Sequence, residues 1–110
     1  MKVKVVRLGR WEFPGEFPDF ARGTPVALAA KEDTDFLGWH ACNIEGHETY
    51  VPIVFVRDGK LARDYNPTEL TPQVGDTLEV REIVNAWLLA TNGQGSTGWI
   101  PAEMVASVGD

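Results

Sequence analysis

The stretch of this chain that most restricts its fold runs from residue 87 to residue 105. Leu88 and Ala90 alternate with their neighbours, which is the period of a β-strand with one buried face. A glycine-rich turn follows, and Pro101 ends the next short apolar run. The pattern predicts a strand, a turn, a second strand and a tight helical turn. Because a hairpin this short cannot bury a core alone, we expect the earlier segments to supply further strands of the same fold.

The chain also repeats itself at an offset of 49 residues. The residues that recur are Ala90, Gly95, Trp99, Pro101 and Val105, which follow Ala41, Gly46, Tyr50, Pro52 and Val56. Repetition at this period predicts two similar supersecondary units. We place these copies at residues 1–57 and 58–110, with residues 57–60 as a joint too short to act as a free tether. The two copies are therefore expected to pack against each other.

Short alternating runs without a long helical segment predict an all-β fold built from two small barrels. The expected strands are residues 2–7, 25–30, 38–44, 49–51, 61–64, 77–84, 87–91 and 97–100. In the second copy, the parity of these strands leaves Trp87 and Leu89 outside. The residues it places inside are Leu78, Val80, Leu88, Ala90, Ile100 and Val105.

Charge and hydropathy argue against several classes of partner. The chain is acidic, with a net charge of -6 and an isoelectric point near 4.8. Nucleic-acid binding draws its affinity from Lys and Arg, so a nucleic-acid partner is not expected. No apolar run has the length of a secretory signal or a membrane span, so we expect a cytoplasmic protein without a membrane partner. The single cysteine, Cys42, excludes an internal disulfide.

Residues that could hold a metal or act as nucleophiles are few. His40, Cys42 and His47 are the soft ligands, and three such residues without a repeated cysteine pair are a weak zinc signal. We interpret them as ordinary surface polar residues. Acidic neighbours such as Glu45 and Glu48 disfavour a Cys42 thiolate. No phosphate-binding loop, nucleophile elbow or paired-carboxylate motif is present, so we expect no enzyme activity, no metal and no cofactor.

Five motifs of the second half resemble the Src homology 3 domain and occur in that family's order. They are residues 61–65, 69–70, 75–78, 87–90 and 98–105. Residues 1–57 resemble a degenerate second copy, with residues 23–24 at the Gly-Asp step and residues 50–56 as the closing segment. The resemblance implies two tandem five-stranded barrels without catalytic activity. Typical members of the family bind extended proline-rich peptides in aromatic grooves.

The same resemblance implies a peptide groove on the second copy. The residues at the groove positions are Tyr65, Glu69, Trp87, Pro101 and Met104, with Glu69 placed to attract a basic side chain. A polyproline helix is already stiff, so flat aromatic walls bind it at a small entropic cost. Arg63 and Met104 stand where the family has tyrosines, and the usual acidic loop is shortened. We therefore expect a ligand that does not depend on a flanking arginine.

Two functions remain open from the sequence. The chain is either a protein or peptide recognition module, or a structural unit whose Tyr65 and Trp87 are buried between the copies or in a homodimer. Residues 11–20 contain Glu-Phe-Pro twice and leave a further choice. Their aromatic side chains cap the core, or the segment lies across a groove of the other copy, or it forms an exposed recognition patch. The candidate capping side chains are Trp11, Phe17 and Phe20.

Overall fold

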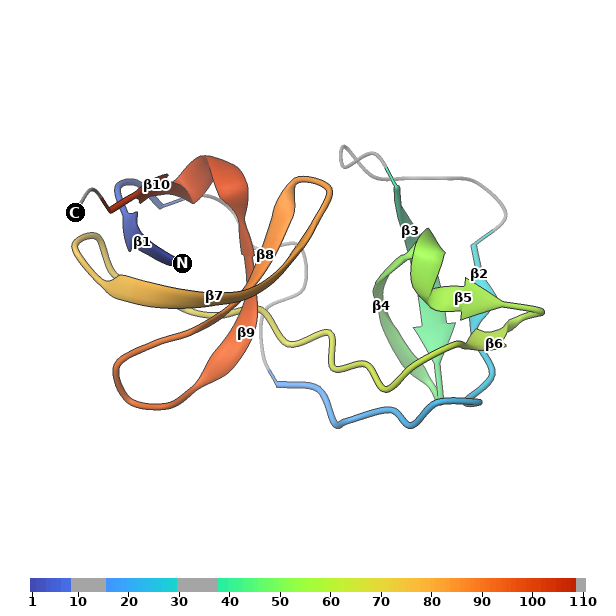
Figure 1. Cartoon of the computed structure of the whole chain (residues 1–110). Helices are drawn as coiled ribbons and strands as arrows, with labels where there is room; N and C mark the ends of the chain where they lie inside the picture. Colours follow the sequence, from blue (N-terminus) through green and yellow to red (C-terminus); the bar gives the residue numbers. More distant parts are fainter. Residues whose placement is uncertain (9–15, 30–37, 109–110) are drawn as a thin grey trace. The chain divides into compact units, whose positions relative to one another are not determined.

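Alternating short runs give the chain an all-β fold, interrupted by two single turns of 3-10 helix (Figure 1). The computed structural model describes residues 1–8, 16–29 and 38–108. It divides into two compact units. Unit 1 consists of residues 1–15 and 68–110, and unit 2 consists of residues 16–67. The chain therefore leaves unit 1 once and returns to it.

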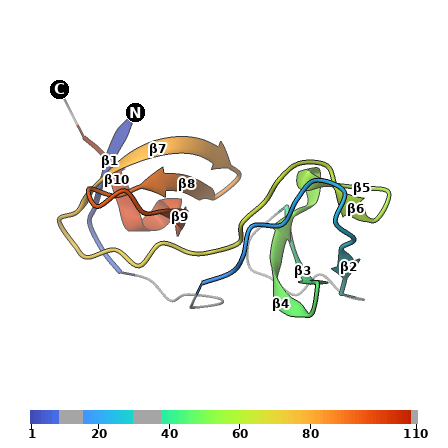
Figure 2. The ribbon, with the colours of Figure 1, turned by 90° about the horizontal axis from the view of Figure 1, so that it is seen from below.

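Unit 1 contains a five-stranded antiparallel sheet. Its strands are β1 (Lys2–Val5), β7 (Thr77–Val84), β8 (Trp87–Thr91), β9 (Thr97–Pro101) and β10 (Val105–Ser107). They lie in the order β10-β1-β7-β8-β9, which Figure 2 shows from a second direction. Lys4 lies opposite Ala106 on one side and opposite Thr77 on the other. The first strand of the chain thus lies inside a sheet whose other strands come from the second half.

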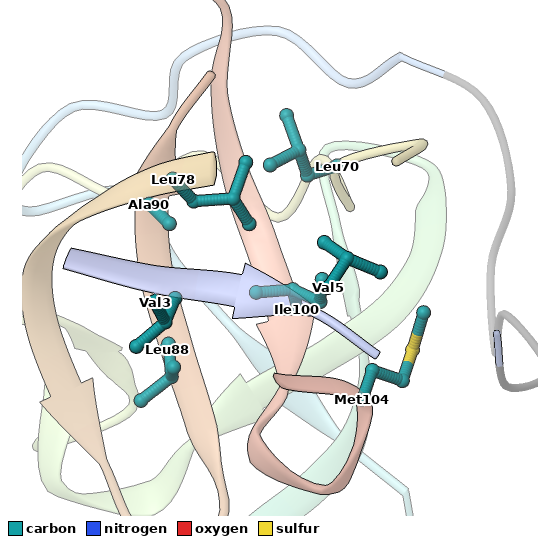
Figure 3. Close-up of a cluster of buried hydrophobic side chains, with 8 residues drawn as sticks. All are labelled: Val3, Val5, Leu70, Leu78, Leu88, Ala90, Ile100 and Met104. Atoms are coloured by element: carbon teal, nitrogen blue, oxygen red, sulfur yellow. The ribbon is translucent and has the colours of Figure 1, made fainter. Parts of the chain in front are cut away.

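The core of unit 1 follows the period-two pattern of its strands. Val3 and Val5 are buried, whereas Lys2 and Lys4, which alternate with them, are exposed. The core cluster consists of Val3, Val5, Leu70, Leu78, Leu88, Ala90, Ile100 and Met104 (Figure 3). Of the positions predicted to face inward, Leu78, Leu88, Ala90 and Ile100 belong to this cluster, and Val80 and Val105 are partly buried against it. Trp87, predicted to face outward, is buried as well. Fully burying a valine or leucine side chain stabilises a fold by roughly 1.5–3 kcal/mol, so the cluster is the main source of stability in unit 1.

A short extended segment runs parallel to β9. The Leu70 N–H donates to the Trp99 carbonyl at 2.8 Å, and the Trp99 N–H donates to the Thr68 carbonyl at 2.9 Å. Gly98 permits this approach, since a Cβ atom at that position would lie 2.7 Å from the Leu70 backbone nitrogen. The segment places Leu70 in the core and Glu69 beside Trp99.

Unit 2 contains a three-stranded and a two-stranded sheet. The first consists of β2 (Ala27–Leu28), β3 (Trp39–Ile44) and β4 (His47–Pro52), in that order. The second consists of β5 (Val56–Arg57) and β6 (Lys60–Leu61). The 3-10 turn η1 (Ile53–Phe55) joins the two sheets and buries Phe55. The described residues of unit 2 thus form two separate sheets, whereas those of unit 1 form one open five-stranded sheet with β10 and β9 at its edges. The predicted closed barrels are not found among the described residues.

Each unit contains one strand from the other half of the sequence: β1 lies in the sheet of unit 1, and β6 lies in a sheet of unit 2. The elements that follow β3 and β8 recur, and η2 (Ala102–Met104) lies 49 residues after η1. However, β1 pairs with β7 and β10, whereas β6 pairs with β5, and Lys60 forms a bridge to Pro25. The observed units therefore differ from the predicted copies at 1–57 and 58–110, because each contains a strand from the other half.

The predicted joint at residues 57–60 is a hairpin turn inside unit 2. Arg57 pairs with Lys60 across the ladder, and Asp58 and Gly59 have φ angles of 53° and 73°. Two consecutive residues with positive φ are typical of the type I′ turn that joins two-residue hairpins. The sequence Asp-Gly at the turn is one of the pairs this geometry favours.

The described part of the aromatic loop belongs to unit 2. Phe20 is 1% exposed and pairs with Tyr65 through two backbone hydrogen bonds of 2.8 and 2.9 Å. Phe17 is half-buried, and its ring lies 6.0 Å from the His47 ring. Phe20 thus packs in the interior, as the capping interpretation predicts. Trp11 lies outside the described residues.

Candidate functional site

The five predicted groove residues are all buried, and they do not all belong to one unit. The exposed fraction is 4% for Tyr65, 9% for Glu69, 4% for Trp87 and 2% for Met104, and Pro101 is also buried. Tyr65 lies in unit 2 and the other four lie in unit 1. Trp87 and Pro101 are brought together as opposite residues of β8 and β9. That Glu69, Trp87 and Pro101 contact a ligand stays a prediction.

Met104 takes a different place from the one predicted. Its side chain belongs to the unit 1 core with Val5 and Ile100, instead of forming a wall of a surface groove (Figure 3). The physical reason is the 3-10 turn η2, which begins after Pro101 and turns Met104 inward while leaving Glu103 exposed.

Tyr65 belongs to an aromatic group in unit 2. Its hydroxyl donates to the Tyr50 carbonyl at 2.6 Å, and its ring meets the edge of the Phe55 ring at a centroid distance of 5.6 Å. The guanidinium carbon of Arg63 lies 4.2 Å from the Phe55 ring centroid, which is cation-π geometry. Phe55 lies 49 residues before Met104. The repeat could therefore have identified Phe55 as the aromatic partner of Tyr65.

An open pocket of about 420 Å³ lies beside Tyr65. It is lined by Asp19, Phe20, Ala21, Asp64, Tyr65 and Asn66, and we call it the Tyr65 pocket. Its two walls are the segments that pair through Phe20 and Tyr65. One wall comes from each half of the sequence, so the pocket exists only because residues 60–66 pair within unit 2.

Two carboxylates are held at the rim of the Tyr65 pocket. Asp19 accepts a hydrogen bond from the Asn66 side-chain amide at 2.9 Å, and Asp64 accepts one from the Arg22 backbone N–H at 2.8 Å. A carboxylate has about four acceptor positions, so each can accept further bonds from a ligand. The motif analysis did not find these carboxylates, because they lie 45 residues apart in the sequence.

Cys42 is buried, which corrects its interpretation as a surface polar residue. Burial raises the pKa of the Cys42 thiol to about 12, so the thiol is protonated at neutral pH. His40 places Nε2 at 3.0 Å from the Ala29 carbonyl, and His47 packs against the edges of two phenylalanine rings. Among the residues that the structure describes, no three His, Cys, Asp or Glu side chains form a group that could hold a metal ion.

Comparison with known proteins supports the resemblance found in the sequence. Residues 59–108 match the family described as variant SH3 domain, where SH3 denotes Src homology 3. This confirms the resemblance predicted for the second half. The search of curated proteins and the search of solved structures gave no match. SH3-like domains are generally non-catalytic protein-interaction modules. In the described part of the chain, no helix is long and apolar enough to span a bilayer.

Proposed function

We propose that this chain is a non-catalytic interaction module that uses the Tyr65 pocket to hold a basic side chain of an extended peptide. The observation that carries this proposal is the pair of carboxylates, Asp19 and Asp64, that line an open pocket beside the buried rings of Phe20 and Tyr65. The match of residues 59–108 to an interaction family supports the same class of function.

The chemistry of the pocket favours arginine in the ligand. A planar guanidinium donates paired hydrogen bonds to a carboxylate, and Asp19 and Asp64 both keep acceptor positions for such bonds. A neighbouring proline in the ligand would lower the cost of ordering an extended segment. This proposal differs from the expectation of an arginine-independent ligand, which stays a prediction, because Asp19 and Asp64 offer two carboxylates that the shortened loop does not contain.

Isothermal titration of the intact chain with two proline-rich peptides tests the proposal. The peptides are identical except that one carries arginine where the other carries glutamine. We expect the arginine peptide to bind about tenfold more tightly, which corresponds to about 1.4 kcal/mol. The variant Asp19→Asn with Asp64→Asn should lose this preference, since it keeps both hydrogen-bond acceptors and removes both charges.

The matched control is Glu45→Gln with Glu48→Gln, which removes the same charge from exposed positions of unit 2 outside the pocket. This control should keep the preference for arginine. Equal affinities of the intact chain for both peptides, or an unchanged preference in the pocket variant, would show that the pocket does not read a basic side chain.

The burial of Trp87 favours a second candidate, a structural unit in a larger assembly. At 4% exposed, this indole has little surface to offer a peptide. In that case the predicted groove of unit 1 serves packing, and a second copy of the chain is one candidate partner. Iodide quenching separates the two roles: a fluorescence component that is lost in Trp87→Ala and resists iodide indicates packing, whereas efficient quenching indicates an accessible ligand surface. The cytoplasmic location and the absence of nucleic-acid and membrane partners stay predictions.

A further inference from the structure

A second open pocket of unit 2, about 400 Å³ in volume, is lined by basic side chains. Arg22, Arg57 and Lys60 line it together with Asp58, and we call it the Lys60 pocket. Four Lys or Arg residues lie in the described part of unit 2, and three of them line this pocket. All three are exposed.

The backbone brings these cations together. Arg57 and Lys60 are opposite residues of the β5–β6 hairpin, so their side chains leave the same side of the ladder. Arg22 precedes Gly23, whose N–H donates to the Leu61 carbonyl at 2.8 Å. Like charges that face each other across a ladder destabilise it. Arg57 and Lys60 therefore repel each other across the hairpin, and a bound anion would reduce this repulsion.

In the described part of unit 2, the cations around the Lys60 pocket outnumber the carboxylates beside them. Across residues 16–29 and 38–67, no hydrogen bond or ion pair joins the side chains of Arg22, Arg57 or Lys60 to a carboxylate. Among the described residues, Asp58 is the one carboxylate that lines the pocket, and Asp64 lies beside it, where it accepts a hydrogen bond from the Arg22 backbone N–H at 2.8 Å. Three cations and these two carboxylates give a formal local charge of +1. This local charge is opposite in sign to the net charge of -6 on the whole chain.

We infer that the Lys60 pocket binds side-chain carboxylates of an acidic peptide segment in a partner protein. Guanidinium groups bind carboxylates with paired, charge-assisted hydrogen bonds. A short acidic segment can place its charge in one small basic pocket. An extended polyanion such as a nucleic acid or an anionic bilayer would also meet the acidic remainder of the chain, which repels it. This site goes beyond the proposed function, which uses the Tyr65 pocket.

Amide chemical shifts of the intact ¹⁵N-labelled chain test the inference. The probes are a peptide of six glutamates, a peptide of six lysines and inorganic phosphate, each titrated at low ionic strength. We expect the glutamate peptide to shift the amides of Gly23, Gly59 and Lys60 in a saturable way. In the variant Arg57→Gln with Lys60→Gln, the dissociation constant should rise about tenfold, since each exposed charge pair contributes modestly.

The matched control is Lys2→Gln with Lys4→Gln, which removes the same charge from exposed positions of unit 1. The inference predicts that this control binds the glutamate peptide as the unaltered chain does. Equal weakening in both variants would mean that net charge alone drives binding, and would overturn the site. Saturation by phosphate without saturation by the glutamate peptide would overturn the peptide partner. Because the Tyr65 pocket carboxylates are intact in both variants, failure here leaves the arginine titration unaffected.

Discussion

Strand β1 comes from the first half of the sequence, and its contribution to the stability of unit 1 can be tested quantitatively. Val5 is fully buried in the unit 1 core, and Val5→Ala removes two methyl groups from it. At about 0.8 kcal/mol for each buried carbon, with a further term for the cavity, the free energy of unfolding of unit 1 should fall by about 2 kcal/mol. For a unit this small, a urea m value of about 1 kcal/mol/M converts this loss into a midpoint about 2 M lower.

The assay is urea unfolding followed by amide NMR signals, because it reports each unit separately. Ala90 reports on unit 1 and Val51 reports on unit 2. We expect Val5→Ala to lower the midpoint read at Ala90, and Lys4→Ala, on the exposed face of the same strand, to change it little. A lower urea midpoint at the Val51 amide, with the midpoint at Ala90 unchanged, would refute the reasoning, since β1 would then belong to unit 2.

Three further predictions follow from the same contacts. A fragment of residues 59–108 should fail to fold alone, as measured by amide dispersion, because it lacks β1, and adding a peptide of residues 1–8 should recover dispersion. Gly98→Ala should destabilise unit 1 by about 1–3 kcal/mol in urea unfolding because its Cβ meets the Leu70 backbone, whereas Gly93→Ala, with open space around it, should not. Cys42 should alkylate slowly with iodoacetamide at pH 8 in the native chain and quickly in urea. Because its native pKa of about 12 lies above the ordinary value of 9.0, its contribution to stability is full below pH 9 and is lost as the pH rises toward 12.

The local features of the fold are predictable from the sequence. Alternation identified the strands and the inward positions Leu78, Leu88, Ala90 and Ile100, because side-chain direction depends only on position within a strand. Pro101 marked the 3-10 turn that follows β9, since its fixed φ and missing N–H interrupt a ladder. These features depend on neighbouring residues, which a sequence shows directly.

Strand pairing between the halves is not predictable in the same way. Each predicted copy begins with a strand, residues 2–7 and 61–64, and the alternating pattern does not say which sheet each of these strands joins. Val3 and Val5 indicate that β1 has a buried face, but the pattern does not say which sheet covers it. The Tyr65 pocket was missed for this reason, because Asp19 and Asp64 become neighbours only after residues 60–66 pair with the first half.

Met104 shows the other limit of a family resemblance. Its position in the motif predicts a groove wall, but a flexible apolar side chain gains more from burial in the core than a tyrosine, whose hydroxyl needs a partner. Phe55 holds the equivalent position of the first half and packs against Tyr65. The aromatic contact of Tyr65 therefore forms in unit 2, where both proposed binding pockets also lie.

A nuclear Overhauser spectrum of the intact labelled chain decides whether the two halves exchange strands. The exchanged arrangement predicts cross-strand backbone contacts from Lys4 to Ala106 and to Thr77, and from Lys60 to Arg57 and to Pro25. Contacts from residues 2–5 to residues 56–57, together with contacts from residues 60–61 to residues 105–107, would place each strand with its own half. That result would contradict the exchange and remove the basis for both pockets.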